Sequence, residues 1–142
     1  MAIYDPKQMQ VLINGVEVED YADGADVIKA VQNAEAGAWT IGADGGGVFV
    51  ADANESATFT LKLRQHGETN KILSELYRKQ KKSLKGLTPL RVTIRDLINK
   101  DVVTGEEGYF TAAPEFTRGA GHNATTWTIV CLKSDFKLEA GI

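Results

Sequence analysis

The side chains that most often carry out chemistry are few in this sequence and lie far apart. The chain has 142 residues, with two histidines, His66 and His122, and a single cysteine, Cys131. One thiolate and two distant imidazoles do not make a zinc site, which takes four such ligands. Cys131 lies in an apolar run, TTWTIVCLK, where a buried small hydrophobe is expected rather than a nucleophile. No spacing indicates a catalytic triad. We therefore predict that the protein is not an enzyme and binds no cofactor.

A segment rich in glycine and acids is the other place where a ligand could bind. The run GADGGG at residues 42–47 lacks the Lys-Ser/Thr of a phosphate-binding loop, and no helix is expected after it. A turn is therefore the better interpretation. The oxygens of Asp44, Asp52, Asn54 and Glu55 suit Ca²⁺, but their spacing is not that of an EF-hand loop. We predict no metal site.

Five cations between residues 78 and 85 raise the question of nucleic-acid binding; they are Arg78, Lys79, Lys81, Lys82 and Lys85. They fall in the last turns of a predicted helix, where positive charge interacts favourably with the helix dipole. A solvated or subunit-facing helix surface is favoured over a DNA contact.

The net charge of −3 conceals a strong asymmetry along the chain. Residues 1–61 contain two bases and ten acids, residues 62–100 eleven bases and three acids, and residues 101–142 three bases and six acids. Such blocks can complement one another within a subunit or between copies. The negative total argues against a dedicated DNA-binding protein.

A strand and a helix in the middle of the chain organise these side chains. Phe59, Leu61 and Leu63 alternate with polar residues over 58–64, which is the period of a half-buried strand. From residue 72 the apolar spacing becomes helical and predicts one helix over about 69–84. Its apolar face consists of Ile72, Leu73, Leu76, Tyr77 and Leu84. Gly67 breaks the strand, Thr69 or Asn70 can cap the helix, and Gly86 can end it.

The rest of the chain is typical of a mainly β protein. Strands are expected at 8–13, 16–20, 27–31, 90–95, 101–104, 109–113 and 125–132. Asn14-Gly15 predicts a tight hairpin turn between the first two. Residues 105–108 are expected to form an acidic loop, Pro114 to interrupt a strand, and a bulge near Lys133 or Ser134 to redirect the last strand.

Residues 34–57, called the arm below, form a long connection that is too apolar to be a free linker. The arm contains Trp39, Ile41, Val48, Phe49 and Val50. We expect it to protrude from a single domain, residues 1–142, and to bury these side chains against another surface. The chain shows no signal segment and no apolar run of about 18 residues, so no membrane segment is expected.

The middle of the chain resembles the tail tube proteins of contractile-tailed bacteriophages. The resemblance rests on WTIGADG (39–45), Asn54-Glu55-Ser56, the strand TFTLKL (58–63), Gln65, Asn70, Leu73-Ser74, Arg95-Asp96, a strand with Pro114-Glu115-Phe116, and Thr126-Trp127. It extends over about residues 9–138.

This resemblance implies the tube fold shared with the secretion tube protein Hcp: two packed antiparallel sheets that form a small barrel or sandwich, with one helix on the flank. It implies that six copies close into a ring and that rings stack into a channel for DNA during ejection. The implied partners are the protein itself, the tail sheath, baseplate and tape-measure proteins, and transiently DNA. The protein would be part of the virion and made in the bacterial host cytoplasm.

Two sets of residues are expected to join copies of the protein. The arm contacts are Trp39, Ile41, Asp44, Val48 and Phe49. The charges expected between stacked rings are Glu17, Glu19, Asp20, Asp23, Asp26, Lys81 and Lys82. If the polar face of the strand at 58–64 lines the channel, Lys62 and Arg64 should be paired with acids, because free cations would hold DNA.

Two other interpretations remain open. A baseplate, tail-terminator or secretion-tube protein of the same fold is the closer one. A monomeric β-barrel binding module is the other, and exposed aromatic side chains on one strand face would favour it. In the sequence, however, Trp39, Trp127, Phe59 and Phe116 all sit among core-like residues.

Overall fold

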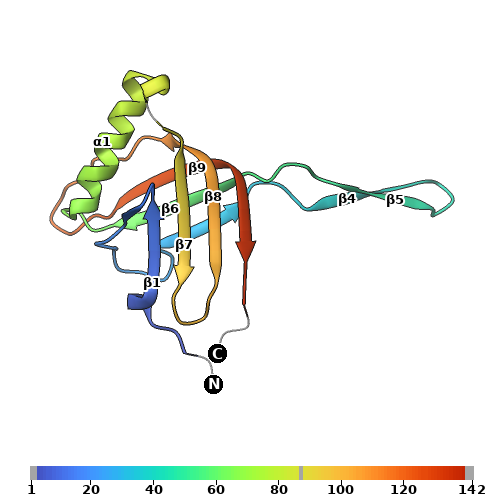
Figure 1. Cartoon of the computed structure of the whole chain (residues 1–142), viewed down its shortest axis with the longest axis horizontal. Helices are drawn as coiled ribbons and strands as arrows, with labels where there is room; N and C mark the ends of the chain where they lie inside the picture. The colour runs from blue at the N-terminus through green and yellow to red at the C-terminus, as the bar shows by residue number, and fades with distance from the viewer. Residues whose placement is uncertain (1–2, 87, 140–142) are drawn as a thin grey trace.

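The computed structural model describes residues 3–86 and 88–139, which form mainly β-strands and one α-helix (Figure 1). In chain order the elements are η1 (Pro6–Gln8), β1 (Met9–Ile13), β2 (Val16–Glu17), β3 (Ile28–Gln32), β4 (Gly37–Ile41), β5 (Gly47–Ala51), β6 (Ala57–Leu63), α1 (Glu68–Lys82), η2 (Leu84–Gly86), β7 (Leu90–Asp96), β8 (Val102–Ala112) and β9 (Thr125–Lys137). The predicted fold class is confirmed. Residues 1–2, 87 and 140–142 of the predicted domain lie outside the described residues.

Seven strands form one antiparallel sheet in the order β2-β1-β7-β8-β9-β6-β3. In Figure 1, β1, β7 and β8 run across the direction of β3 and β6, so the sheet folds over on itself. The outermost strands, β2 and β3, do not pair with each other in the described residues. Of the two predicted forms, the open sandwich is therefore the one found, and the sheet does not close into a barrel.

The hydrophobic core fills the space between the two halves of the folded sheet. Every second residue of β6 is buried, as the period of two predicts. Phe59, Leu61 and Trp127 come from β6 and β9, and Val11 and Val92 come from β1 and β7 on the other side. The Asn14-Gly15 turn is also confirmed, because both residues have positive φ, 51° and 83°, as the tight hairpin turn requires.

The single α-helix packs one side against the core, as its spacing predicts. Leu73 is buried, and Leu76 and Tyr77 are half-buried against the core. The Tyr77 ring meets Phe110 edge to face at 5.8 Å between centroids. Leu84 is exposed instead, because α1 ends at Lys82 and Leu84 belongs to the following 3₁₀ turn.

The expected caps of this helix, Thr69 and Asn70, are wrong. The N-cap position is Gly67, which has no side chain to offer, so the Glu68 N–H donates to Oδ2 of Asp20 at 3.1 Å. Thr69 lies inside the helix, where its buried hydroxyl accepts from the Glu19 N–H at 3.0 Å. The cap thus comes from a residue distant in sequence, which local patterns do not reveal.

The loop expected at 105–108 is also wrong, because β8 runs through it as one strand. A Cβ at Gly105 would lie 2.5 Å from Cε2 of Phe59, and a Cβ at Gly108 would lie 2.7 Å from Sγ of Cys131. Both glycines are therefore required for close packing in the core, not for a turn.

The bulge expected at Lys133 or Ser134 is absent, since β9 pairs in regular register there. Buried side chains nevertheless change parity, from Ile129 and Cys131 to the half-buried Phe136. The backbone irregularity lies on the neighbouring strand β8, at Glu107, which has a φ of 55°. The neighbouring strand thus supplies the bend that was expected within β9.

The arm projects away from the folded sheet as a long hairpin (Figure 1). Within it, β4 and β5 form a separate two-stranded sheet, which pairs with no other strand among residues 3–86 and 88–139. The arm extends outward from the ends of β3 and β6, the strands that precede and follow it in the chain.

Candidate subunit interface

The acids and glycines of the arm are used to build its turns. The Gly46 N–H donates to Oδ1 of Asp44 at 3.0 Å, and Gly45 has a φ of 86°, a conformation that glycine adopts without strain. At the base of the arm, Oδ1 of Asp52 accepts from the Asn54 N–H, and Oδ1 of Asn54 accepts from the Ser56 N–H. The described residues contain no cluster of three or more acids, histidines or cysteines that could hold a metal.

Both faces of the β4–β5 hairpin carry apolar side chains. Trp39 is opposite Phe49 in the register, and their rings meet edge to face at 5.3 Å between centroids. Ile41 shares this face because it lies two residues from Trp39. Val48 and Val50 project from the other face. All five side chains are exposed in one copy, 65% in the case of Trp39.

Two of the four aromatic side chains expected in the core are on the surface instead. Phe59 and Trp127 are buried, whereas Trp39 and Phe116 are 65% and 81% exposed. Phe116 lies outside any strand, because β8 ends at Ala112, before the proline at 114 that lacks an N–H for the ladder. The Arg118 guanidinium covers the Phe116 ring at 4.2 Å from its centroid. Trp39 belongs to the arm, which was expected to protrude, so its exposure in one copy agrees with that prediction. A core position for Phe116 was wrong, because aromatic character alone does not show which surface covers a ring.

The charges predicted for ring stacking divide into two groups. Asp20 pairs with Arg64 at 2.6 Å, and Asp26 pairs with Lys62 at 2.9 Å. The hydrogen bond from Lys62 lowers the pKa of Asp26. The second group is exposed and makes no ion pair in the described residues: Glu17, Glu19, Asp23, Lys81 and Lys82.

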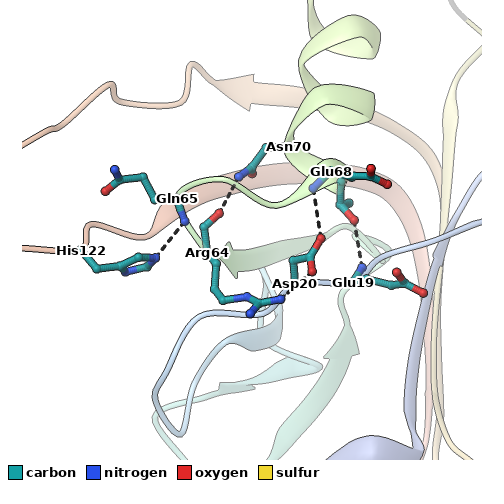
Figure 2. Close-up of polar contacts among 8 residues, drawn as sticks. Glu19, Asp20, Arg64, Gln65, Glu68, Asn70 and His122 are labelled. Atoms are coloured by element: carbon teal, nitrogen blue, oxygen red, sulfur yellow. Dashed lines mark hydrogen bonds and ion pairs between the residues drawn. The ribbon is translucent and has the colours of Figure 1, made fainter.

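Asp20 belongs to a polar cluster that fastens the start of α1 to the end of β6 (Figure 2). It accepts from the Glu68 N–H and from Arg64, and the Asn70 side chain donates to the Arg64 carbonyl at 2.7 Å. The Gln65 N–H donates to Nε2 of His122 at 2.9 Å, which gives this histidine a structural contact. Sequence reasoning did not find this cluster, since its members come from three separate segments.

Two ionisable groups, the Cys131 thiol and the Tyr21 hydroxyl, are buried in the body of the protein. Cys131 is fully buried in the core, as predicted for a small hydrophobe, and this burial raises the pKa of its thiol to about 11. The Tyr21 hydroxyl is buried with no hydrogen-bond partner in the described residues. Burial, and then the charges of Glu17 and Glu19, raise its pKa above the usual value.

A folded-over sheet with one flanking helix and a projecting hairpin, apolar on both faces, defines a structural subunit with uncovered surfaces. A comparison with protein families identifies the class: residues 4–139 match the family model of the bacteriophage PhiTE tail tube protein. The chain belongs to this family of phage tail tube proteins, which are structural components of the virion. No curated protein sequence matches the chain. No helix in the described residues is both long and apolar enough to cross a membrane.

The fold is similar to a chain in the cryo-EM structure of the anti-feeding prophage cap, the AFP tube terminating cap. The TM-score is 0.63 at 11% sequence identity, and the match covers 97% of this chain and 93% of the other. At this identity the likeness is one of fold.

Proposed function

We propose that this protein is the tail tube subunit of a contractile-tailed bacteriophage, and that six copies close into a ring. Stacked rings then form a hollow tube through which DNA passes during ejection. Residues 1–142 act as one domain of this ring, with the arm as its projecting part. The observation that carries the proposal, beside the family, is the β4–β5 hairpin, whose five exposed apolar side chains have no cover within one copy.

Burying those side chains on an adjacent subunit supplies the main free energy of assembly. A large apolar side chain that is fully buried contributes about 1.5–3 kcal/mol, and the contribution repeats at every subunit. Trp39, Ile41 and Phe49 form one contact face, Val48 extends the other, and Asp44 shapes the turn between the strands. The free edges of β2 and β3 also need neighbours, since an open edge otherwise templates aggregation.

The polar face of β6 is suited to line a channel that does not hold DNA. Lys62 on β6 and Arg64 just after it both pair with acids of the same subunit. Lys29, opposite Thr60 on the neighbouring strand β3, is exposed and lies near the Asp26 carboxylate, whose pKa its charge helps to lower. Each phosphate neutralised by a free cation would add affinity through counterion release. Pairing within the subunit prevents this.

The helix lies on the other side of the same sheet. The Trp127 indole N–H donates to Oδ1 of Asn70 at 2.9 Å, and Leu73 packs in the core. This puts α1 on the core side of β6 and β9, opposite the polar face of β6. If that face lines the channel, the basic residues 78–85 are on the outer wall, where sheath proteins would surround the tube.

The tail sheath, baseplate and tape-measure proteins are the other partners we propose, and the host cytoplasm is the place of synthesis. A second candidate function is that of a tube-terminating cap or baseplate ring, which the fold of the AFP cap favours. The two functions differ in whether rings continue to stack.

Negative-stain electron microscopy of the purified protein, with light scattering of the same sample, tests the proposal. Hollow tubes of many stacked rings support the tube subunit. Single rings that do not lengthen with protein concentration favour the cap. A soluble species that stays monomeric at high concentration and moderate salt contradicts both.

A further inference from the structure

We infer that His66 and His122 form a proton-sensitive latch, which holds the loop between β8 and β9 (residues 113–124) on the end of β6 at neutral pH and releases it in mild acid. They are the only two histidines of the chain. Although they are far apart in sequence, both line one surface pocket of about 380 Å³. The latch acts within one subunit and does not depend on tube assembly.

The loop is joined to the rest of the protein by few contacts. Among residues 3–86 and 88–139, two hydrogen bonds link it to another segment, and both involve Gln65. The Gln65 N–H donates to Nε2 of His122 at 2.9 Å (Figure 2), and the Asn123 N–H donates to Oε1 of Gln65 at 3.0 Å. A Cβ at Gly119 or Gly121 would meet nothing within 4 Å. The position of the loop therefore depends on Gln65.

Gln65 lies at the point where the ladder between β6 and β9 ends. The last backbone pair of this ladder is Leu63 with Thr125, and the same register continued by two residues places Gln65 opposite Asn123. At this point side-chain acceptors take the place of the backbone ladder. The latch thus holds the loop as a continuation of the sheet.

The protonation states in the latch follow from two backbone N–H groups, because such a group can only donate. The Gln65 N–H requires Nε2 of His122 to accept, so this ring is neutral and carries its proton on Nδ1. The Asn123 N–H turns Oε1 of Gln65 toward the loop, which leaves the amide nitrogen of Gln65, a donor, 3.2 Å from Nε2 of His66. His66 therefore also accepts at Nε2, and both imidazoles are neutral in the closed latch.

Protonation turns both acceptors into donors. A histidinium carries N–H groups on both ring nitrogens, so each ring would face a Gln65 donor with a donor. Histidine is the side chain that ordinarily changes its charge between about pH 5 and 8. The closed latch binds fewer protons than the open one, so closure is favoured as pH rises and is lost as pH falls through this range.

The charged neighbours of the two imidazoles have opposite signs. Asp20, Arg64 and Glu68 line the same pocket. Asp20 pairs with Arg64 at 2.6 Å and accepts from the Glu68 N–H. The Arg64 charge opposes protonation of a histidine, whereas the Glu68 carboxylate, which makes no ion pair in the described residues, favours it. The hydrogen bonds to Gln65 therefore determine which protonation state holds the loop.

The latch controls an exposed aromatic side chain. Phe116 is 81% exposed on this loop, and the Arg118 guanidinium lies 4.2 Å from the centroid of its ring. At neutral pH the closed latch gives this pair a fixed place on the surface. In mild acid the pair moves with the released loop.

Nuclear magnetic resonance of the full-length protein tests the latch, in solution for free subunits and in the solid state for tubes. We expect the ring ¹⁵N shifts at pH 8 to show both histidines with the proton on Nδ1. Between pH 7.5 and 5.5, we expect the protection of the Gln65 and Asn123 amides against hydrogen exchange, corrected for the intrinsic rate, to fall by about fivefold, as for the loss of one hydrogen bond. His122 protonated on Nε2 at pH 8, or equal protection at both pH values, would overturn the inference.

Two substitutions of His122 separate a proton-sensitive contact from a merely structural one. His122→Gln keeps an acceptor, Oε1, at the same reach but does not titrate, so we expect the Gln65 N–H to stay protected at both pH values. The matched control, His122→Ala, removes the acceptor, and we expect low protection of this amide at both. A fivefold loss of protection with acid in His122→Gln, or full protection in His122→Ala, would contradict the latch. Neither result bears on tube assembly, so the proposed function would stand.

Discussion

Trp39 and Trp127 are the same residue type in opposite environments, and substitution should separate their roles. Trp39 is 65% exposed on the arm, whereas Trp127 is 2% exposed in the core. We predict that Trp39→Ala abolishes assembly and changes the free energy of unfolding of the monomer by less than about 1 kcal/mol. The matched control, Trp127→Ala, should lose about 3–5 kcal/mol of stability. Urea denaturation and sedimentation of the same samples check both.

An unfolded Trp39→Ala protein would show that the indole supports the body of the fold. Normal tubes from the Trp39→Ala variant would show that the indole contributes nothing to assembly.

Asp96 should make the protein sensitive to acid. It is buried, and hydrogen bonds from Asn99 and Ile98 hold its pKa below the usual range of an aspartate. A carboxylate whose pKa is lowered by folding stabilises the native state above its unfolded pKa, and this contribution is lost as pH falls through the lower native pKa. We predict that the urea midpoint falls steeply below about pH 4, and less steeply in Asp96→Asn, which is already less stable at pH 7. Parallel pH profiles for the two proteins would exclude this role of Asp96.

The glycines of β8 mark where sequence reasoning fails at the residue scale. Glycine is favoured in turns, and also at strand positions that have no room for a side chain. From the sequence alone, Gly105 and Gly108 therefore look like loop residues. What distinguishes the two is the position of the Phe59 ring and the Cys131 sulfur, 2.5–2.8 Å from the missing Cβ atoms. Those neighbours are far away in sequence.

At the scale of elements, local sequence signals predict where helices and hairpins form, but they miss contacts made by side chains that are distant in sequence. The spacing of Leu73, Leu76 and Tyr77 predicts the helix, and Asn14-Gly15 predicts the first hairpin. The cap of α1 was missed because it comes from Asp20, 48 residues before the N–H that it accepts from. The sequence suggested that the Asp20 carboxylate pairs with a base across stacked rings. Within one copy, however, it already accepts hydrogen bonds from Arg64 and from the Glu68 N–H.

Asp20 therefore offers a prediction about α1. Asp20→Ala removes the acceptor for the Glu68 N–H and the partner of Arg64, and we expect a loss of about 0.5–2 kcal/mol of stability, as for other helix caps. The matched control is Asp23→Ala, an exposed acid of the same block with no ion pair in the described residues. Thermal unfolding of the two variants measures the difference. Equal transition temperatures would mean that the cap contributes nothing.

The arm was the most informative element to predict. Its apolar residues and its glycines indicated a hairpin that needs a partner, and the structure contains that hairpin as β4 and β5. Two of its acids, Asp44 and Asp52, each accept a hydrogen bond from a backbone N–H of the arm and so help to shape its turns.

At the scale of the whole molecule, charge should set the register of stacked rings while apolar burial supplies the stability. The unpaired group Glu17, Glu19 and Asp23 on one copy would meet Lys81 and Lys82 on another. Exposed pairs contribute only about 0–1 kcal/mol each, and salt screens charges more than about 8 Å apart at physiological strength. We predict that mean tube length falls modestly with salt.

The double variant Lys81→Glu/Lys82→Glu should shorten tubes more than salt does, and the charge-matched control is Lys71→Glu/Arg78→Glu on the same helix. Tube lengths measured by electron microscopy over a salt series check this. An unchanged length in every condition would remove electrostatics from the account of stacking.

A cryo-EM reconstruction of the assembled protein tests most directly whether rings of this protein enclose a channel. We predict a hollow stack of rings, with the polar face of β6 toward the lumen and Lys62 and Arg64 still paired to Asp26 and Asp20. We also predict α1 on the outer wall and each arm packed on an adjacent subunit. A solid or purely monomeric species, or a lumen lined by the basic side of α1, would contradict it.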